Sequence, residues 1–395
     1  MTDWNKYKLG QLAEIKGGKR LPKGNLLVDF DTGHPYIRVT DLGNKWVKKQ
    51  GLQFVTPDIQ KKIARYTVNK GDVIISIVGS IGVIGKISNE LDGANLTENC
   101  MKFVLKYNIL DNDFLYYFLI SNIGQDEIEK RTVGSTQPKL PLYNIKDIDI
   151  LLPSLNEQTK IAGILSSLDD KIDLLHRQNK TLEALAETLF RQWFIEEADE
   201  NWETLRVYDV ADINTNTIQK NSLYSEIEYL DTGSITKGII DGFQYYKLID
   251  APSRAQRIVQ KYDIVYSLVR PIQRHYGLLY DTNPNTVVST GFCVITCSNI
   301  SPYFLYLLLT TDESVEHFDM IAEGSTSTYP SLKPSDIANF EFQKPPNDKL
   351  IKFDNVVSCS WNKIISNNRQ IRTLTQLRDT LLPKLMSGEV RVNFK

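Results

Sequence analysis

The amino-acid sequence contains an internal duplication, and this feature constrains the fold more than any other. Four blocks from the first half of the 395 residues recur in the same order in the second half, displaced by 190 to 198 positions. In the first block, the residues Trp4, Leu9, Leu12, Ala13, Glu14 and Ile15 correspond to Trp202, Val207, Val210, Ala211, Asp212 and Ile213. The other three blocks begin at Val68, Gly134 and Arg177 and recur from Val259, Gly324 and Arg369. A repeat of this length indicates two copies of one structural unit.

Some loops differ between the copies although the surrounding pattern is retained. The stretch Gly79-Ser80-Ile81-Gly82 stands where the second copy has Arg270-Pro271-Ile272-Gln273. A shared scaffold with different loops allows one architecture to recognise two different ligands. The alternative interpretation is that these loops have drifted and have no role.

Each copy begins with a region that we expect to fold as a mixed α+β domain. Runs at 73–78, 265–269 and 287–297 are rich in β-branched residues and are bounded by Gly, Asn and Pro, which indicates strands. A short apolar helix is indicated in each copy, at 113–121 and at 302–311. The two globular domains are predicted at residues 1–153 and 197–346.

Each globular region is followed by a pattern typical of a long helix, and we expect these helices at residues 154–196 and 347–390. Ser154 and Glu157 have the spacing of a capping box, and Asn347 or Asp348 can cap the second helix. Along both helices the seam positions alternate at spacings of four and three residues, as in a coiled coil. The predicted helix–helix seam contains Leu165, Leu168, Ile172, Leu175, Asn179, Leu182, Leu189, Val357, Ile364, Asn367, Ile371, Leu374 and Leu381.

A seam of this length must be buried, and the nearest partner for each helix is its own duplicate. Duplicated units tend to pack about a twofold axis, so an antiparallel pair is expected. If residues whose numbers sum to 546 face each other, every seam position of one helix lies opposite a seam position of the other, and Asn179 lies opposite Asn367. The predicted architecture is therefore two tandem α+β domains separated by two long helices in an antiparallel, pseudo-twofold coiled coil. The alternative is that each helix packs only on its own domain.

The net charge of −2 argues against a simple nucleic-acid-binding protein, because phosphate affinity usually comes from an excess of Lys and Arg. The charge is uneven, however. Residues 1–150 hold 21 basic and 17 acidic residues, a net of +4, whereas residues 201–345 hold 11 and 17, a net of −6. The apolar stretches are broken well before the roughly 18 residues of a membrane span, and the sequence starts with no export signal. We expect a cytoplasmic protein without a membrane segment.

No catalytic or metal-binding pattern stands out. The segment 79–87 resembles a phosphate-binding loop, but Ser80 stands where that motif needs Gly and Ile87 where it needs Ser or Thr. The four histidines form no close pair, and the four cysteines are too scattered for a disulfide framework or a zinc site, so buried free thiols are expected. The sequence predicts no metal, no cofactor and no enzymatic activity of its own.

Several segments resemble a known family. Residues 154–158, which lead into a heptad helix ending in the segment 189–194, are similar to the central conserved region of the specificity subunits of Type I restriction-modification systems. Residues 381–390 resemble the distal conserved region of those subunits, and residues 134–140 resemble the end of their target-recognition domains. Together the resemblance covers essentially the whole chain.

The resemblance implies a DNA sequence-specificity subunit in which each recognition domain reads one half of a split, asymmetric site on double-stranded DNA. It also implies that the helices set the gap between the half-sites and dock two adenine-N6 methyltransferase subunits, with restriction subunits as further partners. S-adenosylmethionine and ATP would belong to those partners. Much of the nonspecific grip on DNA can then lie outside this chain, which reduces the charge objection.

The candidate DNA-binding residues are polar loop residues near the repeated turns. Arg and Lys can recognise guanine, and Gln can recognise adenine. The first domain offers Lys19, Arg20, Arg38, Ser80, Thr136, Gln137 and Lys139, and the second offers Arg254, Arg270, Gln273, Arg274, Thr326, Ser327 and Tyr329. Because Tyr329 stands where the first domain has Lys139, a phosphate contact by that lysine has no counterpart in the second domain.

Two alternative functions remain open at this point. A tandem-repeat scaffold that binds proteins would show no salt-dependent DNA binding with any methyltransferase partner. A nuclease or methyltransferase with an unrecognised site would show activity in the purified chain alone.

Overall fold

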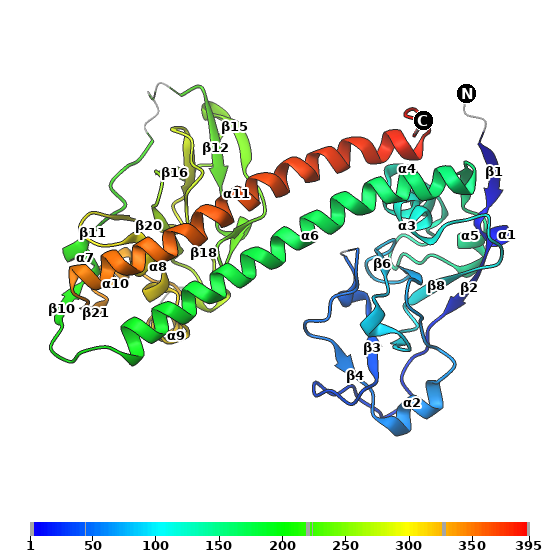
Figure 1. Cartoon of the computed structure of the whole chain (residues 1–395), viewed down its shortest axis with the longest axis horizontal. Coiled ribbons are helices and arrows are strands. Elements are labelled where there is room, and N and C mark those ends of the chain that lie inside the picture. Colours follow the sequence, from blue (N-terminus) through cyan, green and yellow to red (C-terminus); the bar gives the residue numbers. More distant parts are fainter. Residues whose placement is uncertain (1–3, 44, 219–221, 223, 326–328, 393–395) are drawn as a thin grey trace. The chain divides into compact units, whose positions relative to one another are not determined.

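The computed structural model describes residues 4–43, 45–218, 222, 224–325 and 329–392 (Figure 1). The fold divides into two compact units. Unit 1 comprises Met1–Leu174 and Gln370–Lys395, and unit 2 comprises Leu175–Arg369. Each unit therefore contains a β-rich domain together with a segment of each of the two long helices.

Unit 1 is built on three small sheets. Strand β1 (Asn5–Lys8) pairs with β9 (Asp149–Leu152), so that the two ends of the domain lie together. An antiparallel sheet has the order β2 (Ala13–Gly17), β8 (Cys100–Leu105), β5 (Val73–Ser76) and β6 (Ile84–Lys86). A third sheet places β3 (Pro35–Ile37) between β4 (Gln53–Phe54) and β7 (Asn95–Leu96), and β3 and β7 run parallel. All four residues of β5 are buried, as expected for a central strand rich in Val and Ile.

Short helices complete unit 1 and cover its core. They are α1 (Leu9–Leu12), α2 (Pro57–Ile63), α3 (Asn112–Ile120), α4 (Asn122–Arg131) and α5 (Leu142–Lys146), with 3-10 turns at Val39–Asp41 and Asn89–Leu91. Helix α3 begins where the Asp111 carboxylate accepts a hydrogen bond from the Phe114 amide at 2.9 Å. Six of its nine residues are buried, so α3 forms the centre of the unit.

Unit 2 repeats this plan. Strand β10 (Glu203–Arg206) pairs with β21 (Glu341–Lys344), and an antiparallel sheet has the order β11 (Ala211–Ile213), β20 (Phe292–Cys297), β17 (Ile264–Ser267) and β18 (Tyr276–Leu278). A second sheet contains β15 (Gln244–Lys247), β12 (Glu226–Leu230), β19 (Thr286–Ser289) and β16 (Ala255–Ile258), in which β12 and β19 run parallel. Strands β13 (Ile235–Thr236) and β14 (Ile239–Ile240) form a small hairpin.

The helices of unit 2 follow the order of those in unit 1, except that no α-helix in the described part of unit 2 corresponds to α2. They are α7 (Val207–Val210), α8 (Pro302–Leu309), α9 (Asp312–Glu323) and α10 (Pro334–Ala338), with 3-10 turns at Thr232–Ser234, Leu248–Asp250 and Pro271–Gln273, the last labelled η6. The run at 287–297, read from the sequence as one β segment, is two strands in different sheets, because the chain turns at Thr290 and Gly291. The predicted α+β class, with two β-rich domains and two long helices that pack together, is confirmed.

The long helices are α6 (Leu155–Arg191), which continues as a π-helical turn at Gln192–Glu196, and α11 (Asn347–Met386). At the start of α6 the Ser154 hydroxyl accepts a hydrogen bond from the Glu157 amide at 3.3 Å. The Glu157 carboxylate pairs with Arg391 at 2.7 Å. No hydrogen bond from the Ser154 amide to this carboxylate is present among the described residues, so only half of the predicted capping box forms.

In each unit, the segments of α6 and α11 run in opposite directions beside each other and over the domain core (Figure 1). In unit 1, Ile161 and Leu165 of α6 share a cluster with Leu385 of α11 and the apolar face of α3. In unit 2, Phe190 of α6 shares a cluster with Phe353 of α11 and the core beneath. In each unit, therefore, the two helices pack on each other and also on the domain core. These two arrangements were expected as alternatives.

Asparagines at the predicted seam form a polar contact within unit 2. The Asn367 amide donates a hydrogen bond to the Asn179 carbonyl oxygen at 2.8 Å, and the Asn179 amide donates to Asn368 at 2.7 Å. Asn368 in turn donates to the hydroxyl of Tyr280. Each of the thirteen predicted seam residues is buried or half-buried. A polar pair in an apolar seam fixes the register because any other alignment leaves the amides without partners.

Candidate nucleic-acid interface

In unit 1, four loops meet at one end of the sheet β2-β8-β5-β6. Antiparallel pairing brings the end of β2, the start of β8, the end of β5 and the start of β6 to the same edge. Backbone hydrogen bonds join the loops there: the Lys19 amide donates to Leu96 at 2.8 Å, and the Ile77 amide donates to Asn99 at 2.8 Å. The Leu140 amide donates to Ile77 at 3.0 Å. The segments 18–20, 97–99, 77–83 and 133–140 thus form one continuous surface.

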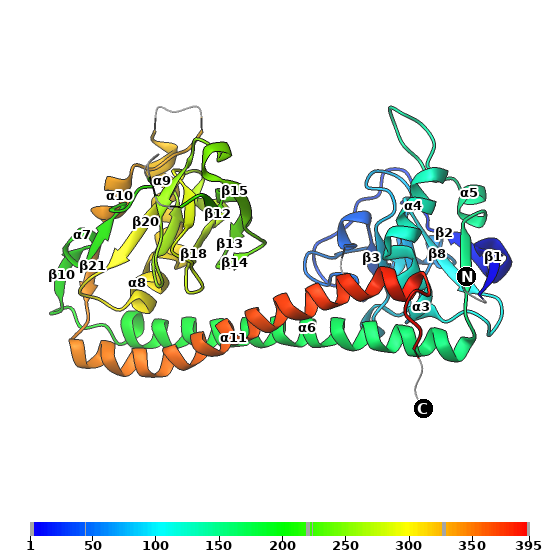
Figure 2. The same cartoon turned by 90° about the horizontal axis from the view of Figure 1, so that it is seen from above.

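Six of the seven residues predicted to contact DNA in the first domain are exposed on this surface: Lys19, Arg20, Ser80, Thr136, Gln137 and Lys139. The last three belong to a loop that two hydrogen bonds of 2.8 Å between Val133 and Lys139 close at its base. This loop follows α4 and projects from the body of the unit (Figure 2). Such a loop can reach into a groove of a ligand while its base stays fixed to the sheet.

Arg38, the seventh residue, serves the fold of unit 1. Its guanidinium contacts the Asp41 carboxylate at 3.1 Å, the Gln53 side chain at 2.6 Å and the Gly51 carbonyl at 2.9 Å. These bonds hold the turn after β3 to the neighbouring strand and occupy most of the donors of the arginine. In this arrangement Arg38 is a scaffold residue.

Unit 2 forms the equivalent surface at the same end of its sheet β11-β20-β17-β18. The Leu268 amide donates to Gly291 at 2.8 Å, and the Leu332 amide donates to Leu268 at 2.7 Å. The Arg270 amide donates to Pro330 at 3.0 Å, so the loop after β17 lies beside the segment that precedes α10. The order of loops is the order found in unit 1.

Five of the seven predicted residues of the second domain lie on or beside this surface. Arg254, Arg270, Gln273 and Tyr329 are exposed, and Arg274 is half-buried. The Thr290 amide donates to the carbonyl oxygen of Arg254 at 2.8 Å, which joins Arg254 to the same set of loops. The predicted contacts Thr326 and Ser327 lie outside the described residues.

The candidate arginines differ in what surrounds them. Arg20 pairs with Glu98 at 2.6 Å, and Arg274 pairs with Asp312 at 2.7 Å. Neither Arg254 nor Arg270 has a carboxylate partner within the described part of the chain. The guanidinium of Arg270 stacks on the Tyr329 ring at 4.9 Å from its centroid. These two arginines keep their hydrogen-bond donors available for a ligand.

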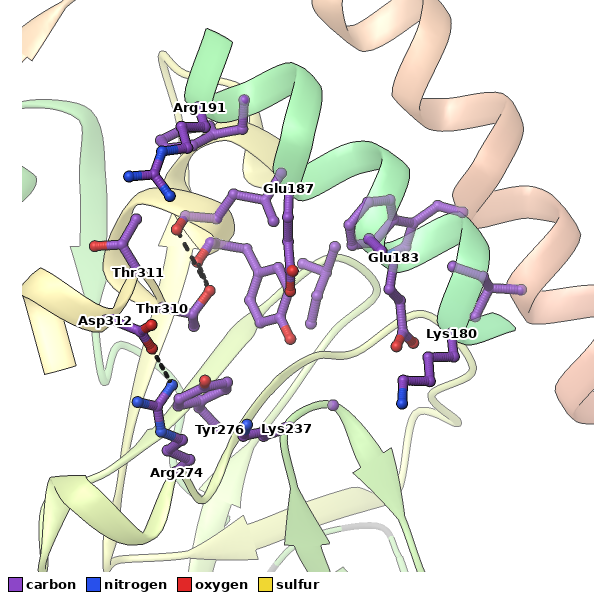
Figure 3. A pocket seen from close by; sticks show the side chains of 18 of the residues that line it. Lys180, Glu183, Glu187, Arg191, Lys237, Arg274, Tyr276, Thr310, Thr311 and Asp312 are labelled. Atoms are coloured by element: carbon purple, nitrogen blue, oxygen red, sulfur yellow. Dashed lines mark hydrogen bonds and ion pairs between the residues drawn. The ribbon is translucent and has the colours of Figure 1, made fainter. Parts of the chain in front are cut away.

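A cavity of about 470 Å³ lies in unit 2 between α6, β18 and the α8–α9 corner (Figure 3). Glu183 and Glu187 of α6 line it, opposite Tyr276 and the Arg274–Asp312 ion pair. Burial and the neighbouring Glu187 raise the pKa of Glu183 from 4.5 to about 7. No sequence motif marks this pair. The only sign of it is the four-residue spacing of the glutamates, which is common on solvated helix faces.

The cysteines and potential metal ligands suggest no chemistry. Burial raises the pKa of the Cys100 and Cys293 thiols to about 12, so both stay protonated at neutral pH. Cys359 is exposed, in contrast to the expectation that the thiols are buried. No group of three or more His, Cys, Asp or Glu side chains in the described ranges is placed to hold a metal ion. Within those ranges, no helix is both long and apolar enough to cross a membrane.

Comparisons with known proteins agree with this arrangement. The Type I restriction modification DNA specificity domain matches residues 1–184 and 199–355. The Type I restriction enzyme MjaIX specificity subunit of Methanocaldococcus jannaschii is 26% identical over 99% of this chain and 94% of that protein. The HindI specificity subunit of Haemophilus influenzae is 23% identical over 99% of this chain and its own full length. The crystal structure of a Type I restriction-modification system S subunit from M. genitalium has the same fold, with a TM-score of 0.59, 18% identity and coverage of 100% of this chain and 97% of that one.

Proposed function

The chain belongs to the Type I restriction-modification DNA specificity family and is the non-catalytic DNA-specificity subunit of such a system, and we propose that each of its units reads one half of a split, asymmetric site on double-stranded DNA. In this proposal the recognition domains are residues 1–153 and 197–346. The helical regions 154–196 and 347–390 connect them.

One observation carries the proposal: both units gather the same loops at the same end of the same sheet, but with different side chains. Hydrogen bonds to base edges discriminate between sequences, whereas phosphate contacts position the protein. Exposed polar loops on a repeated rigid scaffold are suited to base contacts. Because the loops of the two units differ, the two half-sites should differ as well.

The charge distribution supports a division of labour with partner subunits. Residues 201–345, which make up nearly all of the second domain, carry a net charge of −6 and cannot supply much phosphate affinity by themselves. We propose that two adenine-N6 methyltransferase subunits dock on the helices and contribute nonspecific grip, and that restriction subunits join the same complex. S-adenosylmethionine and ATP then bind to the partners, this chain takes no cofactor, and the complex acts in the cytoplasm.

The helices are proposed to set the gap between the half-sites. Both run without a break from one unit to the other, and each unit holds a segment of both. A continuous helix has a fixed rise per residue, so its length converts directly into a spacing along DNA.

A domain exchange tests this function. Residues 1–153 are replaced by the corresponding domain of another family member, and methylated adenines are mapped in cells that also express the methyltransferase partner. We expect one half-site to change while the other half-site and the gap are retained. If both halves changed together, the domains would not read DNA independently. If neither the original nor the exchanged chain directed methylation to a split site, the proposal would fail.

A further inference from the structure

The loop after the central strand has two positions with positive φ in both units. In unit 1 these are Gly79, with φ of +80°, and Gly82, with φ of +77°. In unit 2 they are Arg270, with φ of +49°, and Arg274, with φ of +59°. The pairing of β5 with β6 and of β17 with β18 aligns the loops, with one extra residue in unit 2. Arginine therefore stands in unit 2 where unit 1 uses glycine.

This replacement has an energetic cost. Glycine adopts positive φ freely because it has no Cβ, whereas an L side chain in this region is crowded against its own backbone. A Cβ added at Gly79 would have no atom within 4 Å, so that position in unit 1 has room for a side chain but carries none. A strained residue persists only when the surrounding structure holds it in place, and such residues cluster at functional sites.

The role of Arg274 is local. Its guanidinium pairs with Asp312 at 2.7 Å and lines the cavity opposite α6 (Figure 3). This ion pair ties the loop to the first turn of α9. The strain at Arg274 is thus offset within unit 2, and no ligand is needed to explain it.

The surroundings of Arg270 are different. Its side chain is exposed, stacks on the equally exposed ring of Tyr329, and pairs with no carboxylate in the described ranges. Its backbone is held firmly, since its amide donates to Pro330 at 3.0 Å and its carbonyl oxygen accepts from the Gln273 amide at 2.9 Å. The Ile272 amide adds a bond to the Asp319 carboxylate at 3.2 Å. The loop presents a guanidinium in a fixed position to the outside.

We propose that Arg270 is a specificity-determining residue of the second unit, which reads a guanine in the major groove of its half-site. The inference rests on the proposed function and assigns one base contact within it. The guanidinium fork matches the O6 and N7 acceptors of guanine. Stacking on Tyr329 restricts the side chain before DNA arrives, which reduces the entropy lost on binding. Unit 1, with glycine at this position, must read its half-site with other residues.

Three full-length variants, each assembled with the methyltransferase partner, test the assignment. Arg270→Gly removes the side chain and relieves the backbone. Arg270→Lys keeps the charge and the strained backbone but cannot form the two-pronged contact. Lys237→Gly is the matched control, because Lys237 is a basic residue of the same unit with φ of +47°. Methylated adenines are mapped in cells for each variant, and thermal unfolding is measured on the purified chains.

For both Arg270 variants we expect one guanine position of the second half-site to become degenerate, with discrimination there falling about 5- to 150-fold. The first half-site and the gap should be retained, and Lys237→Gly should leave the whole site unchanged. The unfolding temperature of Arg270→Gly should not fall, whereas a merely structural role would lower it. An unchanged recognition site in both Arg270 variants overturns the inference. The inference also fails if Arg270→Gly lowers methylation equally at all sequences and Arg270→Lys restores it, because that result would indicate a phosphate contact. If the wild-type chain directs no methylation to a split site, the proposed function itself fails.

Discussion

We expect Glu183, on the cavity face of α6, to couple pH to the stability of unit 2. Burial and the charge of Glu187 raise its pKa to about 7, and Lys180, Arg191, Lys237 and Arg274 are the cationic groups that also line the cavity. Between pH 4.5 and about 7 the folded state holds a proton that the unfolded state has lost. Raising the pH through this window should therefore weaken unit 2, by about 2 kcal/mol in free energy of unfolding.

Glu183→Gln should reduce this dependence, although burial also raises the pKa of Glu187 and leaves part of it. The variant is expected to unfold with similar free energy to the parent near pH 4.5 and to be the more stable protein at pH 8. Chemical denaturation at several pH values measures the difference, with the exposed Glu200→Gln as a control that should follow the parent. An equal pH dependence in parent and variant would show that Glu183 ionises normally.

Residue roles were the least predictable feature from the sequence. Arg38 stays a predicted DNA contact, but its guanidinium donates hydrogen bonds to Gln53 and Gly51, which the sequence did not reveal. The strain at Arg270 could not be foreseen, because arginine rarely adopts positive φ and the sequence shows only that glycine was replaced. The cavity beside Glu183 could not be predicted from the sequence, because the residues of its other walls come from distant parts of the chain.

At the scale of elements, Arg378 of α11 forms an ion pair that fastens the helix to the rest of unit 1. The Arg378 guanidinium contacts the Asp169 carboxylate of α6 at 3.0 Å. The other oxygen of that carboxylate accepts a hydrogen bond from the Tyr117 hydroxyl of α3 at 2.6 Å. Burial and the bond to Asp169 raise the pKa of Tyr117, so its hydroxyl remains a donor. One carboxylate thus joins three helices.

Arg378→Met should weaken this junction by about 1–3 kcal/mol, because Asp169 loses its cation while it remains largely buried. Hydrogen exchange in the segment 370–386, followed by mass spectrometry, should become faster. The double variant Arg378→Met with Asp169→Asn should recover part of the loss, and Lys171→Met on the exposed face of α6 serves as the control. Hydrogen exchange in the double variant that is as fast as in Arg378→Met, or faster, would contradict a compensated charge.

The long helices were predictable because their heptad pattern persists over about ten turns, which averages out local exceptions. The short strands were harder. Strands β19 and β20 were read as one run since both are apolar and only two residues separate them. Their assignment to different sheets depends on pairing with β12 and β17, which local sequence does not encode. The amphipathic α4 and α9 were missed because they are short and partly polar.

At the scale of the whole molecule, duplication was the most informative signal. It predicted a repeated architecture before any strand could be placed, and the family comparison supports the function that the resemblance of the helix ends suggested. The sequence recognised by each unit could not be predicted in this way. In the proposed function, recognition depends on the loops that differ between the copies, so the repeat that establishes the scaffold gives no information about them.

The proposed ruler role of the helices makes a quantitative prediction. Because each unit holds segments of both α6 and α11, both helices must be lengthened together. Insertion of one heptad after Leu174 and one after Arg369 keeps the phase of the seam and adds about 10 Å to each helix. With about 3.4 Å per base pair, the gap should lengthen by roughly three base pairs while both half-sequences are retained. Insertion of two residues at the same points rotates the seam by about 200° and should abolish directed methylation. Mapping of methylated adenines decides the question, since a heptad variant that methylates at the original gap would show that the helices do not set the spacing.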